Sequence, residues 1–300
     1  MSSRLRWESE GRDWPQREAS HFVDTPGMTW RVVRAGAGPM LLLLHGTGSS
    51  AHSWAGAISE LSRYFTVIAP DLPGHAFTRG RPRGGLSLRA IIQALSELVA
   101  SAEAIPVMVV GHSAGAAIAV EYARQLDPDF PVIGFNPALM PFPGIAARLF
   151  PAMAKLLFVN PFAPRIFARM ARVPGETERF LKRATGSHIP DESVRCYRTL
   201  LGNSRHCEGA LEMMANWDLP ALAAALPTVR NPVLLVHSRQ DGAIPLEQVR
   251  EAAALLPRGT LVVEEGHGHL AHEENPAMAV QHIIAFARLQ GVLRQEETAI

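Results

Sequence analysis

Short runs of consecutive apolar residues recur along the chain, and stretches with helical periodicity separate them. Continuous apolar runs are typical of strands that are covered on both faces of a sheet. The predicted strands span residues 40–44, 65–69, 107–110, 132–135, 233–236 and 260–263. The predicted helices lie near residues 52–63, 86–103, 114–126, 245–256 and 276–290. This alternation predicts an α/β fold with a mostly parallel central sheet flanked by helices.

Two regions depart from this alternation. Residues 20–34 hold two short runs with strand character, which predict an antiparallel hairpin that opens the sheet. Residues 137–217 hold many prolines among apolar helical pieces, which predicts short helices inserted as a lid over one end of the sheet. We therefore expect an N-terminal extension over residues 1–19, a core over 20–136 and 218–300, and a helical lid over 137–217.

Composition and charge narrow the class of protein. The net charge is only +1, so no field of the whole molecule favours nucleic acid as a partner. The two cysteines form no disulfide framework, and residues 1–30 contain no continuous apolar segment of the kind a secretory signal needs. The apolar run over 40–44 is far too short to span a bilayer. These features predict a cytoplasmic protein whose membrane contact, if any, is peripheral.

The strongest chemical signal is the sequence Gly111-His112-Ser113-Ala114-Gly115. It follows a predicted strand and precedes a predicted helix, which is the setting of a G-x-S-x-G nucleophile elbow. The turn is tight, and a Cβ at either flanking glycine would crowd the neighbouring strand or helix. We therefore predict that Ser113 is a catalytic nucleophile presented at the N-terminus of a helix.

A serine hydroxyl needs a base to take its proton, and in this type of site the base comes late in the chain. The segment after the last predicted strand holds three histidines, His267, His269 and His272. His269 is the preferred base because of its spacing from the helix that starts at 275–276, and His267 and His272 are the alternatives. Three histidines could also indicate a metal site, but no carboxylate and histidine constellation elsewhere supports one, so no metal is expected.

Asp241 is the predicted acid that orients the base. It lies on a loop after the predicted strand 233–236, and ligands of open α/β sheets bind outside the carboxyl ends of the strands. The alternative interpretation is an Asx turn before the helix that follows Pro245. A triad of Ser113, His269 and Asp241 requires no cofactor, and none is expected.

Acyl transfer also needs donors for the oxyanion that develops on the carbonyl group. The turn His45-Gly46-Thr47-Gly48 follows the predicted strand 40–44. The amide of Thr47 is predicted to pair with the amide of Ala114, the residue after the nucleophile. His45, Gly46, Gly48 and His112 are interpreted as supporting loop residues. Asp71 and His75, after the strand 65–69, are interpreted as residues that shape a loop.

These motifs, taken in order over residues 20–290, resemble the α/β-hydrolase superfamily. Its dehalogenases and epoxide hydrolases carry Asp at the elbow, so Ser113 disfavours those chemistries. The segments 4–15 and 111–117 resemble the magnesium-chelatase accessory proteins of photosynthetic bacteria. That resemblance implies a role in bacteriochlorophyll biosynthesis, near the insertion of magnesium into protoporphyrin IX. One departure is Ala76, where many relatives have Gly, and we expect it only to reshape its turn.

Two functions follow as hypotheses. The first is a serine hydrolase that cleaves an ester, thioester or related acyl bond of a small molecule. The second is a non-catalytic accessory protein that binds a tetrapyrrole or the magnesium chelatase. Complementation of a null strain by Ser113→Ala distinguishes them, because full rescue would contradict catalysis.

The lid has an unusual charge. Residues 145–205 carry 11 Lys and Arg against four Asp and Glu, so their net charge is +7 and the rest of the chain carries −6. The favoured interpretation is that its apolar face covers the active site while its charges face water. The alternatives are contact with an anionic membrane surface, or arginines that bind porphyrin carboxylates. The residues concerned are Phe142, Ile145, Leu149, Phe150, Met153, Leu156, Leu157, Phe158, Lys155, Arg165, Arg169 and Arg172.

Overall fold

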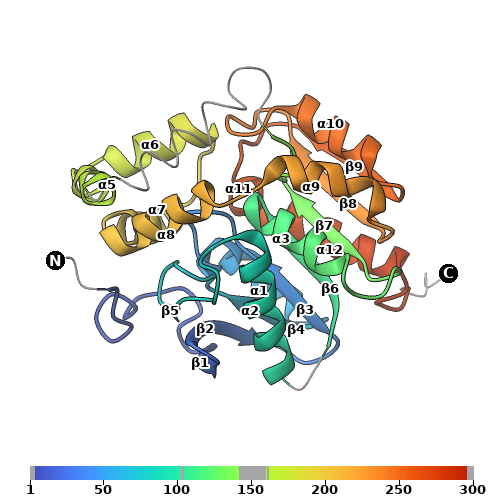
Figure 1. Ribbon diagram of the computed structural model, residues 1–300, viewed down its shortest axis with the longest axis horizontal. Coiled ribbons are helices and arrows are strands. Elements are labelled where there is room, and N and C mark those ends of the chain that lie inside the picture. The colour runs from blue at the N-terminus through green and yellow to red at the C-terminus, as the bar shows by residue number, and fades with distance from the viewer. Residues whose placement is uncertain (1–3, 103–104, 142–159, 161, 296–300) are drawn as a thin grey trace.

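A central β-sheet carries the fold in the computed structural model, which describes residues 4–102, 105–141, 160 and 162–295. Its strand order is β1-β2-β4-β3-β6-β7-β8-β9, and the short β5 pairs with β2 (Figure 1). The strands are β1 (Ser20–Thr25), β2 (Met28–Ala35), β3 (Met40–Leu44), β4 (Thr66–Pro70), β5 (Arg79–Gly80), β6 (Pro106–His112), β7 (Val132–Phe135), β8 (Val233–Ser238) and β9 (Gly259–Glu264). The predicted α/β-hydrolase architecture is confirmed.

The sheet is parallel from β4 to β9 and antiparallel at its first edge. β3 pairs in parallel with both β4 and β6, and β6, β7, β8 and β9 continue the parallel arrangement. β1 and β2 form the predicted hairpin, and β2 pairs antiparallel with β4. All the parallel strands therefore end at the same edge, and the loops that follow them converge there.

Helices cover both faces of this sheet, and five of those described correspond to the predicted segments. The core helices are α1 (Ala55–Leu61), α2 (Leu88–Ser101), α3 (Ala114–Ala123), α10 (Leu246–Leu255), α11 (Ala271–Glu274) and α12 (Pro276–Leu289). The predicted helix 52–63 is divided, because a 3-10 turn, η1 (Ala51–Trp54), precedes α1. The Ser50 side chain caps this turn by accepting a hydrogen bond from the amide of His52.

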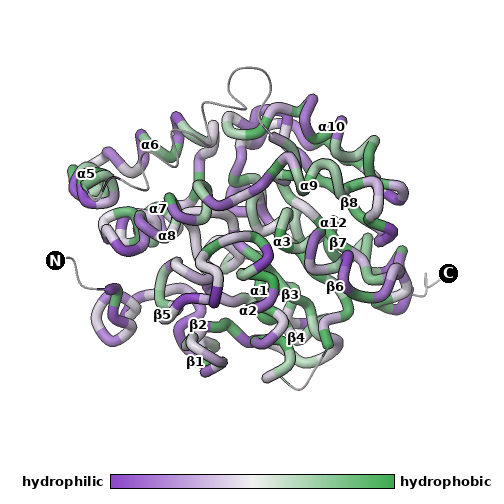
Figure 2. Tube along the Cα trace, in the orientation of Figure 1, coloured by the Kyte–Doolittle hydropathy of each residue, from purple (hydrophilic) through white to green (hydrophobic). Residues whose placement is uncertain are grey.

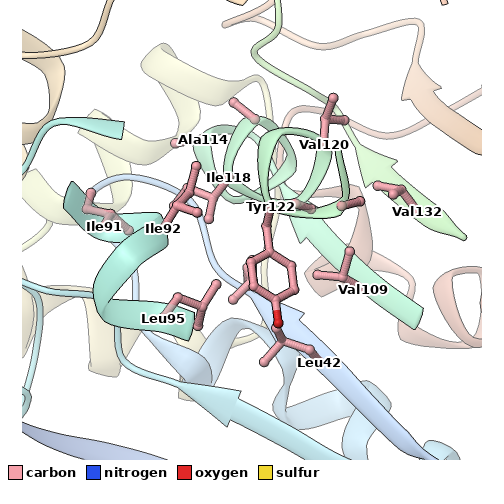
Figure 3. Close-up of a cluster of buried hydrophobic side chains, with 14 of the residues drawn as sticks. Leu42, Ile91, Ile92, Leu95, Val109, Ala114, Ile118, Val120, Tyr122 and Val132 are labelled. Carbon is pink, nitrogen blue, oxygen red and sulfur yellow. The ribbon is translucent and has the colours of Figure 1, made fainter. Parts of the chain in front are cut away.

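The core is divided by the sheet, and β3 shows how. Leu42 and Leu44 belong to the apolar cluster shared with α2, α3 and α10, whereas Leu41 and Leu43 belong to the cluster shared with α1 and α12. Alternate residues of a strand point to opposite faces, so one strand supplies both clusters. Figure 3 shows part of the first cluster, with Leu42 below residues of α2 and α3, and Figure 2 shows the apolar residues gathered around the central strands.

Of the described helices between β7 and β8 in the sequence, the first four, which we call the lid helices after the predicted lid, occupy one side of the molecule, whereas the last lies on the side of α10 and β8 (Figure 1). In order, these described helices are α5 (Ala163–Ala171), α6 (Glu176–Thr185), α7 (Asp191–Leu201), α8 (Ser204–Ala215) and α9 (Leu219–Ala225), followed by the 3-10 turn η2 (Leu226–Thr228). The apolar residues predicted over 142–158 lie outside the described residues. Within the described residues, no helix is both long and apolar enough to span a bilayer.

The segment before β1 packs against both the core and the lid. Leu5 and Trp14 form a buried cluster with Phe77 of the core and with two residues of α7, Cys196 and Leu200. The ring centroids of Trp14 and Phe77 lie 4.9 Å apart in an edge-to-face arrangement. The N-terminal segment therefore joins α7 to the loop that follows β4.

Candidate active site

The turn between β6 and α3 holds Ser113 in a strained backbone conformation. Its φ of 52° and ψ of −115° lie in a region that residues with side chains rarely adopt. The flanking glycines permit the turn: a Cβ on Gly111 would lie 2.2 Å from the Gly115 carbonyl oxygen, and one on Gly115 would lie 2.4 Å from that of Leu44. The strand–turn–helix geometry of a nucleophile elbow is therefore present at Ser113.

Asp241 and His269 meet beyond the carboxyl ends of β8 and β9. His269 Nδ1 donates a hydrogen bond to Asp241 Oδ2 over 2.8 Å, and Asn136 Nδ2 donates to the same oxygen, also over 2.8 Å. Asp241 Oδ1 accepts from the amides of Ala243 and Ile244, at 2.7 and 2.9 Å. The Asx turn considered as an alternative thus exists, but it uses one carboxylate oxygen and leaves the other for His269.

The carboxyl group of Asp241 is held in its ionised form. Burial alone would raise its pKa, but the hydrogen bond and charge of His269, with the donors Ile244 and Asn136, outweigh burial and leave the pKa below its ordinary value. An ionised carboxylate at this position fixes the proton of the imidazole on Nδ1. It leaves Nε2 of a neutral ring free to accept a proton.

The other two histidines of this loop face elsewhere. His272 is buried between the rings of Trp54 and His112, at centroid distances of 4.5 and 4.3 Å, and burial lowers its pKa well below the ordinary value. His267 Nδ1 lies 3.9 Å from a carboxylate oxygen of Glu274. Of the three predicted candidates, the structure brings His269 to Asp241.

The loop after β3 passes over the elbow and carries the predicted oxyanion donors. A Cβ on Gly46 would lie 2.8 Å from His112 Nδ1 and 3.1 Å from Ser113 Cβ, so the loop and the elbow are in direct contact. The amides of Thr47 in this loop and of Ala114 at the start of α3 donate no hydrogen bond within the described part of the chain. Both donors are therefore available to a negatively charged oxygen.

The nucleophile and base loops are connected through His112. Its Nε2 donates to the carbonyl oxygen of His269 over 2.9 Å, and the two ring centroids lie 4.8 Å apart. Among the described residues, no hydrogen bond joins the Ser113 hydroxyl to the His269 ring. Such contacts are often long without substrate and tighten when it binds. Burial lowers the pKa of His112 to about 3, so this ring is neutral and supports the loop.

His45 has both ring nitrogens occupied by the backbone. Its Nε2 accepts from the amide of Leu72 and its Nδ1 donates to the carbonyl oxygen of Gly46, each over 2.8 Å. Burial lowers its pKa well below the ordinary value, so the ring stays neutral. This geometry is compatible with the supporting role predicted for His45.

Asp71 and His75 lie in the loop after β4 and hold its shape. Asp71 forms a fully buried ion pair with Arg31 at 3.2 Å and accepts from the amide of Ala51 at 2.9 Å. His75 Nδ1 donates to the Pro73 carbonyl oxygen over 3.0 Å. Within the described part of the chain, neither side chain has a hydrogen bond to Ser113, Asp241 or His269, the residues of the predicted triad.

The C-terminus of α6 is joined to the acid and base loops. We call residues 185–187 the lid root. The carbonyl oxygen of Thr185 accepts from the amides of His269 and Gly242, at 2.8 and 3.1 Å, and Ser187 Oγ accepts from the amide of Leu270 at 2.8 Å. The segments that carry Asp241 and His269 are thus attached to one turn of the lid.

The loop after β3 is held by α7 and α8 in the same way. Three successive residues of this loop contact lid side chains, and the pairs are Thr47–Met213, Gly48–His206 and Ser49–Tyr197. The contact distances are 3.1, 3.0 and 2.9 Å, respectively. Tyr197 also donates to Glu273 on α11 over 2.7 Å, and burial raises the pKa of Glu273 to about 8. The lid helices therefore position the loop that carries Thr47, the predicted oxyanion donor.

Asn136, His206 and Glu273 were not predicted from the sequence. Asn136 directly follows the predicted strand 132–135, so its position at the carboxyl edge of the sheet was a usable signal. His206 and Glu273 lie within helices and carry no local pattern that points to the site. Within the described residues, no group of three or more His, Cys, Asp or Glu side chains is arranged to hold a metal ion.

The chain belongs to the alpha/beta hydrolase family, whose model matches residues 41–281. It is 39% identical over 264 residues to the magnesium-chelatase 30 kDa subunit of Rhodobacter capsulatus, covering 87% of this chain and 92% of that protein. It is 30% identical to the pimeloyl-[acyl-carrier protein] methyl ester esterase of Aromatoleum aromaticum, covering 82% of this chain and 98% of the esterase.

Solved structures show the same fold at lower sequence identity. A candidate lipase from Acinetobacter baumannii superposes with a TM-score of 0.77 at 21% identity, covering 97% of this chain and 99% of that one. An esterase from Thermogutta terrifontis gives a TM-score of 0.70 at 22% identity, covering 90% and 98% of the two chains. These likenesses establish the architecture alone.

Proposed function

We propose that the protein is a serine hydrolase that cleaves an ester or thioester-type acyl bond, with Ser113, His269 and Asp241 as its triad. The observation that carries the proposal is the hydrogen bond from His269 Nδ1 to an ionised Asp241, at the same sheet edge as the strained elbow of Ser113. A binding protein with no catalytic role has no need for this arrangement.

The reaction follows from these positions. Ser113 Oγ attacks the acyl carbon while His269 Nε2 takes the hydroxyl proton, and the amides of Thr47 and Ala114 stabilise the oxyanion. The imidazolium then protonates the leaving oxygen or sulfur, and an acyl-serine ester remains. A water molecule, deprotonated by His269, attacks that ester and releases the carboxylic acid and free Ser113.

The biological setting is proposed from similarity. The relative at 39% identity is named a magnesium-chelatase subunit, and the relative at 30% identity is named a methyl ester esterase. We therefore propose an acyl or tetrapyrrole substrate, and a role in bacteriochlorophyll biosynthesis near the magnesium-chelation step. In this proposal, residues 20–136 and 218–300 form the catalytic core, 137–217 the lid and 1–19 an N-terminal extension.

A second candidate function is a non-catalytic accessory protein that binds a tetrapyrrole or the magnesium chelatase. The name of the relative at 39% identity favours it. The first experiment is labelling with a fluorophosphonate, with the adduct located by mass spectrometry in the wild type, Ser113→Ala and Ser101→Ala. Ser101 is the control because its hydroxyl is bonded to the Leu98 carbonyl oxygen on α2.

The outcomes separate the two candidates. Adduct on Ser113 in the wild type and in Ser101→Ala, but not in Ser113→Ala, supports an activated nucleophile. A folded wild-type protein without adduct favours the accessory function. Complementation then tests the cellular role: a null strain whose pigment synthesis is fully restored by Ser113→Ala does not depend on the proposed hydrolysis.

A further inference from the structure

Exposed apolar side chains are concentrated on one part of the lid. Ten large apolar side chains of the described residues are exposed, and six of them lie between residues 162 and 180. These six are Phe162, Ile166, Phe167, Met170, Val173 and Phe180, with exposed fractions of 40–62%. A concentration of this kind on an otherwise polar surface marks a site of interaction.

The geometry of α5 makes this concentration a continuous face. Phe162, Ile166 and Met170 are four residues apart, so they form one stripe along the helix, and Val173 follows just beyond its end; we call these four residues the α5 face. The small residues on the opposite side of α5 are buried, where the helix contacts α6, α7 and α8. The apolar stripe is therefore mounted on a packed helix at the edge of the molecule, remote from β8 and β9 (Figure 1).

The charged residues of the segment 162–175 itself are all positive. Arg165, Arg169 and Arg172 are exposed, and the sequence from 162 to 175 contains no acidic residue. Within the described part of the chain, Arg165 and Arg169 form no ion pair. On α6, by contrast, Arg179 is paired with Glu176. The α5 face thus combines exposed aromatic and aliphatic groups with guanidinium groups that are not neutralised.

We propose that the α5 face binds the surface of an anionic lipid bilayer, so that the protein acts as a peripheral membrane protein. An interfacial helix places its apolar side chains among the acyl chains and keeps its arginines at the level of the phosphate groups. Arginine suits this position because its aliphatic stem lies along the apolar surface while the guanidinium group binds phosphate. The proposal stands independently of hydrolysis at Ser113.

Vesicle co-sedimentation tests the proposal. The full chain is mixed with vesicles of phosphatidylcholine alone, or with phosphatidylglycerol added, at low and high salt. Two variants alter the face: Ile166→Ser with Met170→Ser, and Arg165→Gln with Arg169→Gln. The control variant, Leu289→Ser with Arg294→Gln, changes an apolar group of 73% exposure and an exposed arginine near the end of α12. Thermal melts establish that each variant is folded.

The wild type and the control are expected to bind phosphatidylglycerol vesicles, and high salt is expected to weaken that binding. Each arginine near an anionic surface contributes about 1 kcal/mol, so the double arginine variant is expected to bind about 30-fold more weakly. The apolar variant is expected to lose at least as much. Absence of wild-type binding, or equal losses in the control and the face variants, would overturn the proposal. So would a wild type that forms dimers through this face and ignores vesicles.

Discussion

Replacing Asn136 with Gly tests whether Asp241 is maintained as a carboxylate by its neighbours. Asn136 is fully buried, and its side chain donates one of the hydrogen bonds to Asp241 Oδ2. Its φ of 45° is one that glycine adopts without strain, so Asn136→Gly removes the amide group while the backbone stays relaxed. The variant thus isolates the contribution of a single hydrogen bond to a charged group.

The expected magnitude follows from that bond. A hydrogen bond to a charged group contributes about 1.5–3 kcal/mol, and here the acceptor is buried. The free energy of unfolding at pH 7 is expected to fall by about that amount. For a chain of this size the melting temperature falls by about 2 °C per kcal/mol, which gives a decrease of about 3–6 °C.

The penalty is also expected to depend on pH. The pKa of Asp241 is lowered in the folded state, so its contribution to stability is present above the unfolded pKa, about 3.9, and is lost as pH falls through the folded value. Asn136→Gly should therefore cost most at neutral pH and progressively less below about pH 4. Urea unfolding of both proteins across this range measures the difference directly.

Ala76→Gly provides the matched control, because Ala76 is also a non-glycine residue with a positive φ, 44°. It places glycine in the same backbone region but removes no hydrogen bond to a carboxylate. It is expected to be as stable as the wild type or more so, because the left-handed conformation disfavours a Cβ. The reasoning is refuted if Asn136→Gly is as stable as this control at neutral pH, or if its penalty is the same at pH 3.5 and pH 7.

Three further predictions concern positions around the site. His206→Gln retains a donor for the Gly48 carbonyl oxygen and should label with fluorophosphonate at a rate near that of the wild type. His206→Leu removes that donor from the loop that carries Thr47, and should remain folded but label at least about 10-fold more slowly. Between about pH 5 and pH 8 the wild type should lose stability as pH rises, because Glu273, whose pKa is raised, is protonated in the folded state and gives up that proton over this range. Glu273→Gln should show a smaller decrease in melting temperature over the same range. Parallel curves of melting temperature against pH for the two proteins would contradict this. Gly115→Ala should prevent folding or lower the melting temperature by more than 5 °C, as measured by circular dichroism, because the added methyl group would lie 2.4 Å from the Leu44 carbonyl oxygen.

The central strands of the sheet could be predicted closely because they are buried on both faces. The run 233–236 lies inside β8, and 40–44 coincides with β3. The prediction for β4 is displaced by one residue, since Phe65 is fully buried but precedes the strand. An apolar run indicates which residues are buried, and buried residues can lie outside the hydrogen-bonded part of a strand.

The site could be predicted where a local pattern marks it, either as a motif at the elbow or as a loop that follows a predicted strand for Asp241 and His269. The elbow needs glycine on both sides of Ser113, so five consecutive letters indicate it. The contact of His206 with Gly48 joins residues 158 positions apart, and that of Asn136 with Asp241 joins residues 105 apart. No periodicity or motif encodes such pairs, because they depend on how the lid and the sheet edge come together.

The lid root limits how this protein can be recombined with its relatives. The loops that carry Asp241 and His269 both donate a hydrogen bond to the carbonyl oxygen of Thr185. A graft that exchanges the whole insertion therefore also exchanges the residue to which both loops are bonded. A chimaera that takes only the helices before residue 185 keeps that attachment intact. Exchange of substrate preference should therefore be sought in grafts that stop before Thr185, whereas grafts that cross 185–187 would also have to rebuild the support of the loops that carry Asp241 and His269.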